Sequence, residues 1–170
     1  MAVELNVTSL ANEIATPPVK NAVQHFGGRL RVKSETISST STDANGSIYR
    51  FFRVKAHDSI KSLMLYNDTL ATTASTIDVG FHVPKIGGAA VDINAIGSAI
   101  ACNAAVTVGA EIRFETHLIE TVNEAVWETA NVAADPGGGT EYDLTITVLA
   151  RGTTPVTGDI TLVMFYTAGD

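Results

Sequence analysis

The side chains of this 170-residue sequence that could do chemistry are four histidines, one cysteine and eighteen carboxylates. The histidines, His25, His57, His82 and His117, show none of the short spacings that bind zinc, and Cys102 has no cysteine partner. We therefore expect no metal and no cofactor. No cationic neighbour lowers the pKa of Cys102, so we interpret it as a buried, unreactive thiol.

His57, Asp58 and Ser59 have the residue types of a hydrolase triad, but they are consecutive. Neighbours on an extended chain point to opposite sides, so they cannot align as base, orienting acid and nucleophile. The carboxylates around the turn at 135–139 (Asp135, Glu141 and Asp143) lack calcium-loop spacing. With no phosphate-loop pattern in the glycine-rich turns either, the sequence predicts that the protein is not an enzyme.

Charge is scarce and unevenly distributed. Only 17% of the residues are charged, against roughly 25% in an average soluble domain, and the net charge is −7. Residues 1–85 contain nine of the eleven lysines and arginines, whereas residues 86–170 contain eleven of the eighteen carboxylates. A low charge content is typical of a surface that meets other proteins rather than water alone. The acidic total argues against nucleic-acid binding.

A basic face is predicted in the first half of the chain. The segment 29–33 alternates, with three cations on one face and two aliphatic residues on the other. We predict that these cations and two from a later strand contact an acidic protein surface. A solvated strand face is the alternative. The predicted contact residues are Arg29, Arg31, Lys33, Arg53 and Lys55, with Pro17 and Pro18 of the N-terminal segment.

Residues 1–27 are predicted to form an extended N-terminal arm, because they show no sustained strand alternation and Pro17-Pro18 would break a helix. Residues 28–170 are predicted to form one β-domain. Its short strands are separated by turn signals every 8–15 residues, which is typical of an all-β sandwich or a barrel-like roll. Predicted strands include 29–33, 47–55, 59–66, 76–83, 105–108, 111–120, 125–132, 142–150 and 159–167. Isoleucines three and four residues apart predict one short helix at 95–101.

No secretory signal and no membrane-spanning run is visible, so we expect a soluble protein made in a cytoplasm and not exported.

The last third of the chain carries a family resemblance. A Thr-rich strand at 142–148 is followed by the Gly-Thr loop at 151–158 and the closing strand Ile160-Thr161-Leu162-Val163-Met164-Phe165-Tyr166. This order resembles the closing hairpin of small virion structural proteins from tailed bacteriophages. The segments 62–68 and 75–81, which precede an Ala/Gly-rich stretch, are also similar to that family. The resemblance covers roughly residues 46–167 and leaves out the arm.

The resemblance implies a β-sandwich of jelly-roll type and a role as a head decoration or cement protein. Such a protein binds the major capsid protein lattice on the outside of the head of a virion and bridges neighbouring subunits. We expect a dimer or trimer made in the cytoplasm of a host bacterium. A tail, neck or fibre-base protein is the main alternative, followed by a carbohydrate-binding adhesin module. The resemblance assigns no binding residues.

Overall fold

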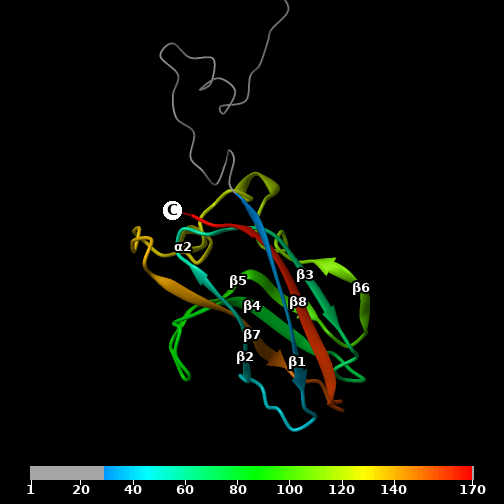
Figure 1. Cartoon of the computed structure of the whole chain (residues 1–170). Helices are drawn as coiled ribbons and strands as arrows, with labels where there is room; N and C mark the ends of the chain where they lie inside the picture. Colours follow the sequence, from blue (N-terminus) through cyan, green and yellow to red (C-terminus); the bar gives the residue numbers. More distant parts are fainter. Residues whose placement is uncertain (1–28, 170) are drawn as a thin grey trace, which may run out of the picture.

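Eight strands form two antiparallel sheets in the computed structural model, which describes residues 29–169 (Figure 1). The order is β1-β8-β3-β6 in one sheet, called sheet A here, and β2-β7-β4-β5 in the other, called sheet B. The strands are β1 (Leu30–Ser39), β2 (Ile48–Lys55), β3 (Ser59–Asn67), β4 (Thr76–His82), β5 (Ala90–Ala101), β6 (Val106–Glu111), β7 (Glu141–Ala150) and β8 (Gly158–Thr167). Between β6 and β7 lie the 3-10 turn η1 (Ile119–Thr121) and the short helix α2 (Val126–Thr129).

The connections repeatedly cross from one sheet to the other. Consecutive strands lie in opposite sheets at every step except β4 to β5, which are neighbours in sheet B. The predicted all-β sandwich is confirmed, while its jelly-roll type stays a prediction. The predicted arm at 1–27 lies outside the described residues, so its boundary stays a prediction. No helix within residues 29–169 is long and apolar enough to cross a membrane.

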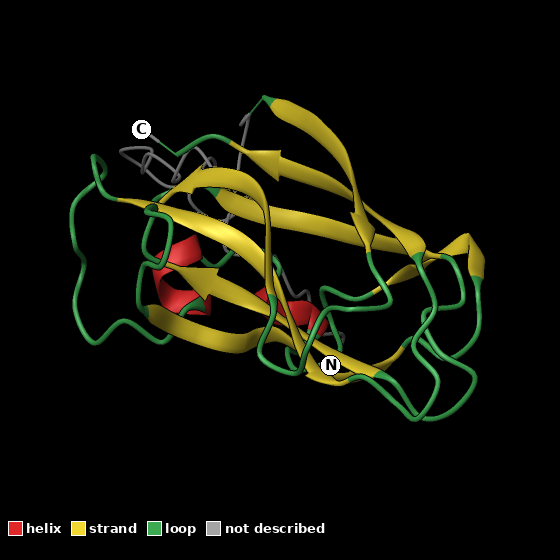
Figure 2. Ribbon diagram, turned by 90° about the horizontal axis from the view of Figure 1, so that it is seen from below, coloured by secondary structure: helices red, strands yellow, loops and turns green. Residues whose placement is uncertain are grey.

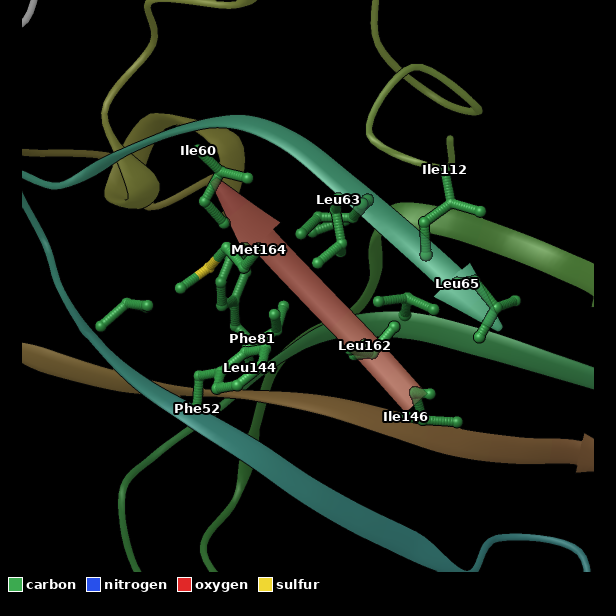
Figure 3. Close-up of a cluster of buried hydrophobic side chains, with 14 of the residues drawn as sticks. Phe52, Ile60, Leu63, Leu65, Phe81, Ile112, Leu144, Ile146, Leu162 and Met164 are labelled. Carbon is green, nitrogen blue, oxygen red and sulfur yellow. The ribbon is translucent and has the colours of Figure 1, made fainter. Parts of the chain in front are cut away.

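The core lies between the two layers, which Figure 2 shows face to face. In β8 the side chains of Ile160, Leu162 and Met164 are fully buried, while the residues between them are partly exposed. Leu162 and Met164 lie beside Phe81 of β4 and Leu144 of β7 in the core (Figure 3). Each such side chain contributes roughly 1.5–3 kcal/mol of burial free energy. The strict alternation in β8 fixes its register, because a slip of one residue would expose the whole row.

The helix predicted at 95–101 is wrong, because these residues end strand β5. Relative to β4, strand β5 has one extra residue between Gly97 and Ile100 and three extra between Asp92 and Gly97. One residue within the first of these bulges, Ala99, has a positive φ of 53°. Bulges interrupt the two-residue repeat of a strand, so the isoleucines recur at helix-like intervals without forming a helix.

The strand predicted at 111–120 is also wrong. Only Glu111 belongs to a strand, and turns and η1 follow it. The consecutive side chains of Ile112 and Arg113 are both buried, which no strand with one exposed face allows. Leu118 and Ile119, by contrast, are well exposed.

The strand predicted at 125–132 is replaced by helix α2. The Glu128 carboxylate accepts a hydrogen bond from the Ala125 backbone N–H at 2.8 Å, which stabilises the first turn. Backbone N–H groups of Val126 and Trp127 donate to the carbonyls of Asp58 and Ala56. These long-range bonds, which no local pattern encodes, hold the segment against the β2–β3 turn.

Candidate docking site

Four of the predicted cations line one pocket of about 470 Å³. It opens between β1 and β2, which are the edge strands of the two sheets and lie against each other. Arg31 and Lys33 come from β1, and Arg53 and Lys55 come from β2. We call this hollow the β1–β2 basic pocket. Its volume falls within the roughly 300–1,000 Å³ range of ligand sites.

The orientation of β1 explains how its cations reach the pocket. Arg31 lies opposite Tyr166 and Lys33 opposite Met164 in the β1–β8 register. Residues opposite each other share a face of the sheet, so these cations lie on the side that faces sheet B. The predicted alternation therefore holds, but the aliphatic face points outward: Leu30 is 57% exposed and Val32 56% exposed.

Two of the four cations have partners in the protein. The Lys33 Nζ donates to the Arg53 carbonyl oxygen at 2.6 Å and lies 5.2 Å from the centre of the Tyr166 ring. The Arg53 Nε donates to Asp143 at 3.0 Å, and this hydrogen bond raises the pKa of Arg53 above its ordinary value. Both contacts pre-organise the pocket wall.

The side chains of Arg31 and Lys55 form no hydrogen bond or ion pair with any residue between 29 and 169. No residue between 29 and 169 neutralises these two charges, so both cations can bind an outside ligand. Two carboxylates, Asp58 and Glu141, also line the pocket and keep its net charge modest.

The remaining predicted contact residues do not line the pocket. Arg29 precedes β1 and is exposed, and it is not part of the pocket wall. Pro17 and Pro18 lie outside the described residues, so their predicted role stays a prediction.

The other walls of the pocket could not be predicted from the sequence. These walls include Tyr166, Ala168 and Gly169, which lie more than 100 residues further along the sequence than the four cations. A side chain at Gly169 would collide with the His57 backbone, since a Cβ there would lie 1.9 Å from that carbonyl oxygen. Because glycine has no side chain, the C-terminal segment can approach the β2–β3 turn closely. No local sequence pattern predicts this contact.

No family model matches the sequence, and a comparison with curated proteins finds no match. Two solved structures share the fold. They are the capsid asymmetric unit of cyanophage Pam1 and the capsid of Ralstonia phage GP4. In each case the TM-score is 0.58 and the sequence identity 18%, over 84% of this chain and 86% of the other. At this identity the likeness shows a common sandwich fold.

His57, Asp58 and Ser59 do not form one site. The His57 Nε2 lies 2.8 Å from Asp135, and this hydrogen bond lowers the pKa of Asp135. Asp58 instead accepts from the backbone N–H groups of Lys55 and Gly169. The buried Ser59 hydroxyl donates to the Glu124 carbonyl oxygen at 2.9 Å. Each side chain thus holds a different piece of backbone or loop.

The predicted burial of Cys102 is confirmed, because the thiol is inaccessible and burial raises its pKa to about 12. A thiol with such a pKa is protonated at neutral pH and is a poor nucleophile. Of the carboxylates weighed for calcium, Asp135 pairs with His57, while Glu141 and Asp143 both face Arg53. Across residues 29–169, no three His, Cys, Asp or Glu side chains could hold a metal ion.

His82 is a buried histidine of sheet B, with a residual exposure of 2%. Its Nδ1 lies 2.8 Å from the Thr145 hydroxyl, which itself donates to the Gly80 carbonyl oxygen. The ring nitrogen is therefore the donor of the pair. Burial lowers the pKa of His82, and the nearby Arg50 lowers it further, although Asp143 opposes them.

The depressed pKa of His82 predicts a loss of stability in mild acid. As the pH falls below about 6.5, the unfolded chain binds a proton at this position before the folded chain does. The free energy of unfolding should therefore fall with a slope of up to about 1.4 kcal/mol per pH unit from this group. Urea unfolding at pH 5–8 measures the slope. H82N keeps a donor near Nδ1 and should have a shallower slope, and an unchanged slope would contradict the assignment.

Proposed function

We propose that this protein is a non-enzymatic accessory protein of a phage head, of the decoration or cement type. It binds the major capsid protein lattice on the capsid surface of the virion and bridges neighbouring subunits. The observation that supports this most is the fold, which recurs over 84% of the chain in the capsid structures of two phages. The two four-stranded sheets and the resemblance of residues 46–167 to small virion proteins support the same proposal.

The proposed mechanism is linkage between binding and assembly. A protein that binds two capsid subunits at once stabilises the assembled shell over separated subunits by mass action. A rigid sandwich suits this task because it holds its loops and edges in fixed positions. The contact surfaces are the β1–β2 basic pocket and the arm at 1–27.

The test is binding of the full chain to phage heads that lack it. We expect co-sedimentation with the heads, saturation at hundreds of copies per particle, and a higher temperature of head disruption. Electron microscopy of the decorated particles would then place the chain on the outer surface. Saturation at a dozen copies or fewer would instead indicate a neck or tail protein, and no binding would contradict a virion role on the shell.

We propose a dimer or trimer as the form that docks. Light scattering of the full chain measures this before any capsid is added. A monomer at all concentrations would contradict the oligomer and leave the capsid test unaffected.

A further inference from the structure

The β1–β2 basic pocket has the features of a binding site rather than of a solvated strand face. The Lys33 side chain is held by a 2.6 Å hydrogen bond to the Arg53 backbone carbonyl oxygen, and the Arg53 side chain is held by its ion pair to Asp143. These two side chains therefore form a wall that needs little reordering when a ligand binds to the other two cations. The site is concave, and its Tyr166 ring provides an apolar wall beside the charges.

The balance of charges in the pocket favours a ligand with few negative charges over a nucleic-acid backbone. Four cations face two carboxylates, Asp58 and Glu141, so the pocket has a small positive excess. A nucleic-acid backbone places one phosphate after another along the surface and would meet these carboxylates. A ligand with one or two separate carboxylates matches the two unengaged cations, Arg31 and Lys55, instead. An arginine also accepts a carboxylate through two parallel hydrogen bonds.

We infer that the β1–β2 basic pocket binds an acidic peptide segment of a protein partner. Arg31 contacts one carboxylate of that segment and Lys55 contacts a second carboxylate or the same one. Lys33 and Arg53 shape the wall. This inference rests on the proposed function only for the source of the segment, which would be a capsid subunit.

The first test measures a defined peptide on the full chain. The probe is a blocked tetra-glutamate peptide, with the tetra-glutamine peptide as its neutral counterpart, titrated by NMR or calorimetry. We expect binding of the glutamate peptide that weakens with added salt, and none of the glutamine peptide. R31Q and K55Q should each raise the Kd about tenfold, the loss expected for one charge-assisted hydrogen-bonding group.

The matched control is K85Q, which removes one positive charge from the exposed loop that follows β4. Its Kd should stay within a factor of about two of the unmodified chain, because Lys85 does not line the pocket and its exposed charge is screened. Arg31 and Lys55 are exposed, so both substitutions should leave the unfolding free energy within about 0.5 kcal/mol. An equal loss in K85Q would overturn the site, as would tighter binding of oligo-dT than of the peptide.

The second test separates this inference from the proposed function. If the R31Q/K55Q double variant decorates heads as well as the unmodified chain, the pocket is not the docking site and the head-binding role stands. If the peptide binds in the pocket but the full chain never binds heads, the pocket inference stands and the head role fails. If neither peptide nor heads bind, both are overturned.

Discussion

Replacing Arg113 with alanine should lower the free energy of unfolding by about 3–5 kcal/mol. The Arg113 side chain is completely buried, and its guanidinium ties three separate segments together. The Nε donates to the Ile60 carbonyl oxygen of β3 at 3.2 Å. The Nη2 donates to the Thr121 carbonyl oxygen of η1 and to the Thr129 hydroxyl of α2. Alanine would leave these acceptors without donors and a cavity beside them.

The measurement is chemical or thermal unfolding, with a midpoint lowered by roughly 6–20 °C for a chain of this size. R113M separates the two causes. Methionine refills most of the volume but donates no hydrogen bond, so its loss should be smaller, about 1–3 kcal/mol. R29A, at an exposed position, should cost no more than about 0.5 kcal/mol. If R113A resembles R29A, the guanidinium does not hold these segments.

Deleting residues 1–27 should abolish head binding and leave the sandwich folded. All buried hydrophobic side chains of the described core lie between Phe52 and Tyr166, so folding should not need the arm. A 27-residue segment can reach up to about 90 Å when extended, far enough to touch a neighbouring capsid subunit. We expect the apparent affinity for heads to fall at least 100-fold, about 2.7 kcal/mol, with unchanged circular dichroism.

The matched variant for the deletion is P17A/P18A. It keeps the arm's length and its charges but removes the restriction that two prolines place on the backbone. Its affinity should fall less than that of the deletion, through a greater entropy cost of ordering the arm. Full head occupancy by the truncated protein would exclude the arm from docking. It would leave the β1–β2 basic pocket as the proposed contact.

The strands that the sequence predicted well are those whose alternation survives in the fold. In β8 the two-residue repeat of apolar residues matches the buried row. The elements that were predicted with the wrong type all lie between Ala90 and Val132, while β1 was predicted too short and runs on to Ser39. In β5, bulges shift the two-residue repeat of the side chains. At Arg113, the chain leaves the strand conformation, and the buried guanidinium donates a hydrogen bond to the Ile60 carbonyl oxygen. The Arg113–Ile60 hydrogen bond joins positions 53 residues apart, and local periodicity contains no information about such a contact.

The basic face could be predicted in part for a similar reason. The alternation of cationic and aliphatic residues at 29–33 predicted that Arg31 and Lys33 share a face. The structure places these two cations beside Arg53 and Lys55. Which cations stay available depends on cross-strand partners that local periodicity does not reveal. Arg53 and Arg50 both bind Asp143, about 90 residues away, through the β2–β7 pairing. The outward direction of Leu30 and Val32 also depends on which side the second sheet covers.

The pairing of β1 with β8 has a mechanical consequence for a protein tethered by its N-terminal segment. Ten antiparallel pairs run from Leu30 opposite Thr167 to Ser39 opposite Gly158. The hydrogen bonds of such a ladder lie perpendicular to the strands. A force applied to Leu30 perpendicular to the strands and in the plane of the sheet would therefore break the β1–β8 hydrogen bonds one after another. A pull along the axis of β1 would load all ten pairs in shear, so the direction of the tether sets the force that the attachment can bear.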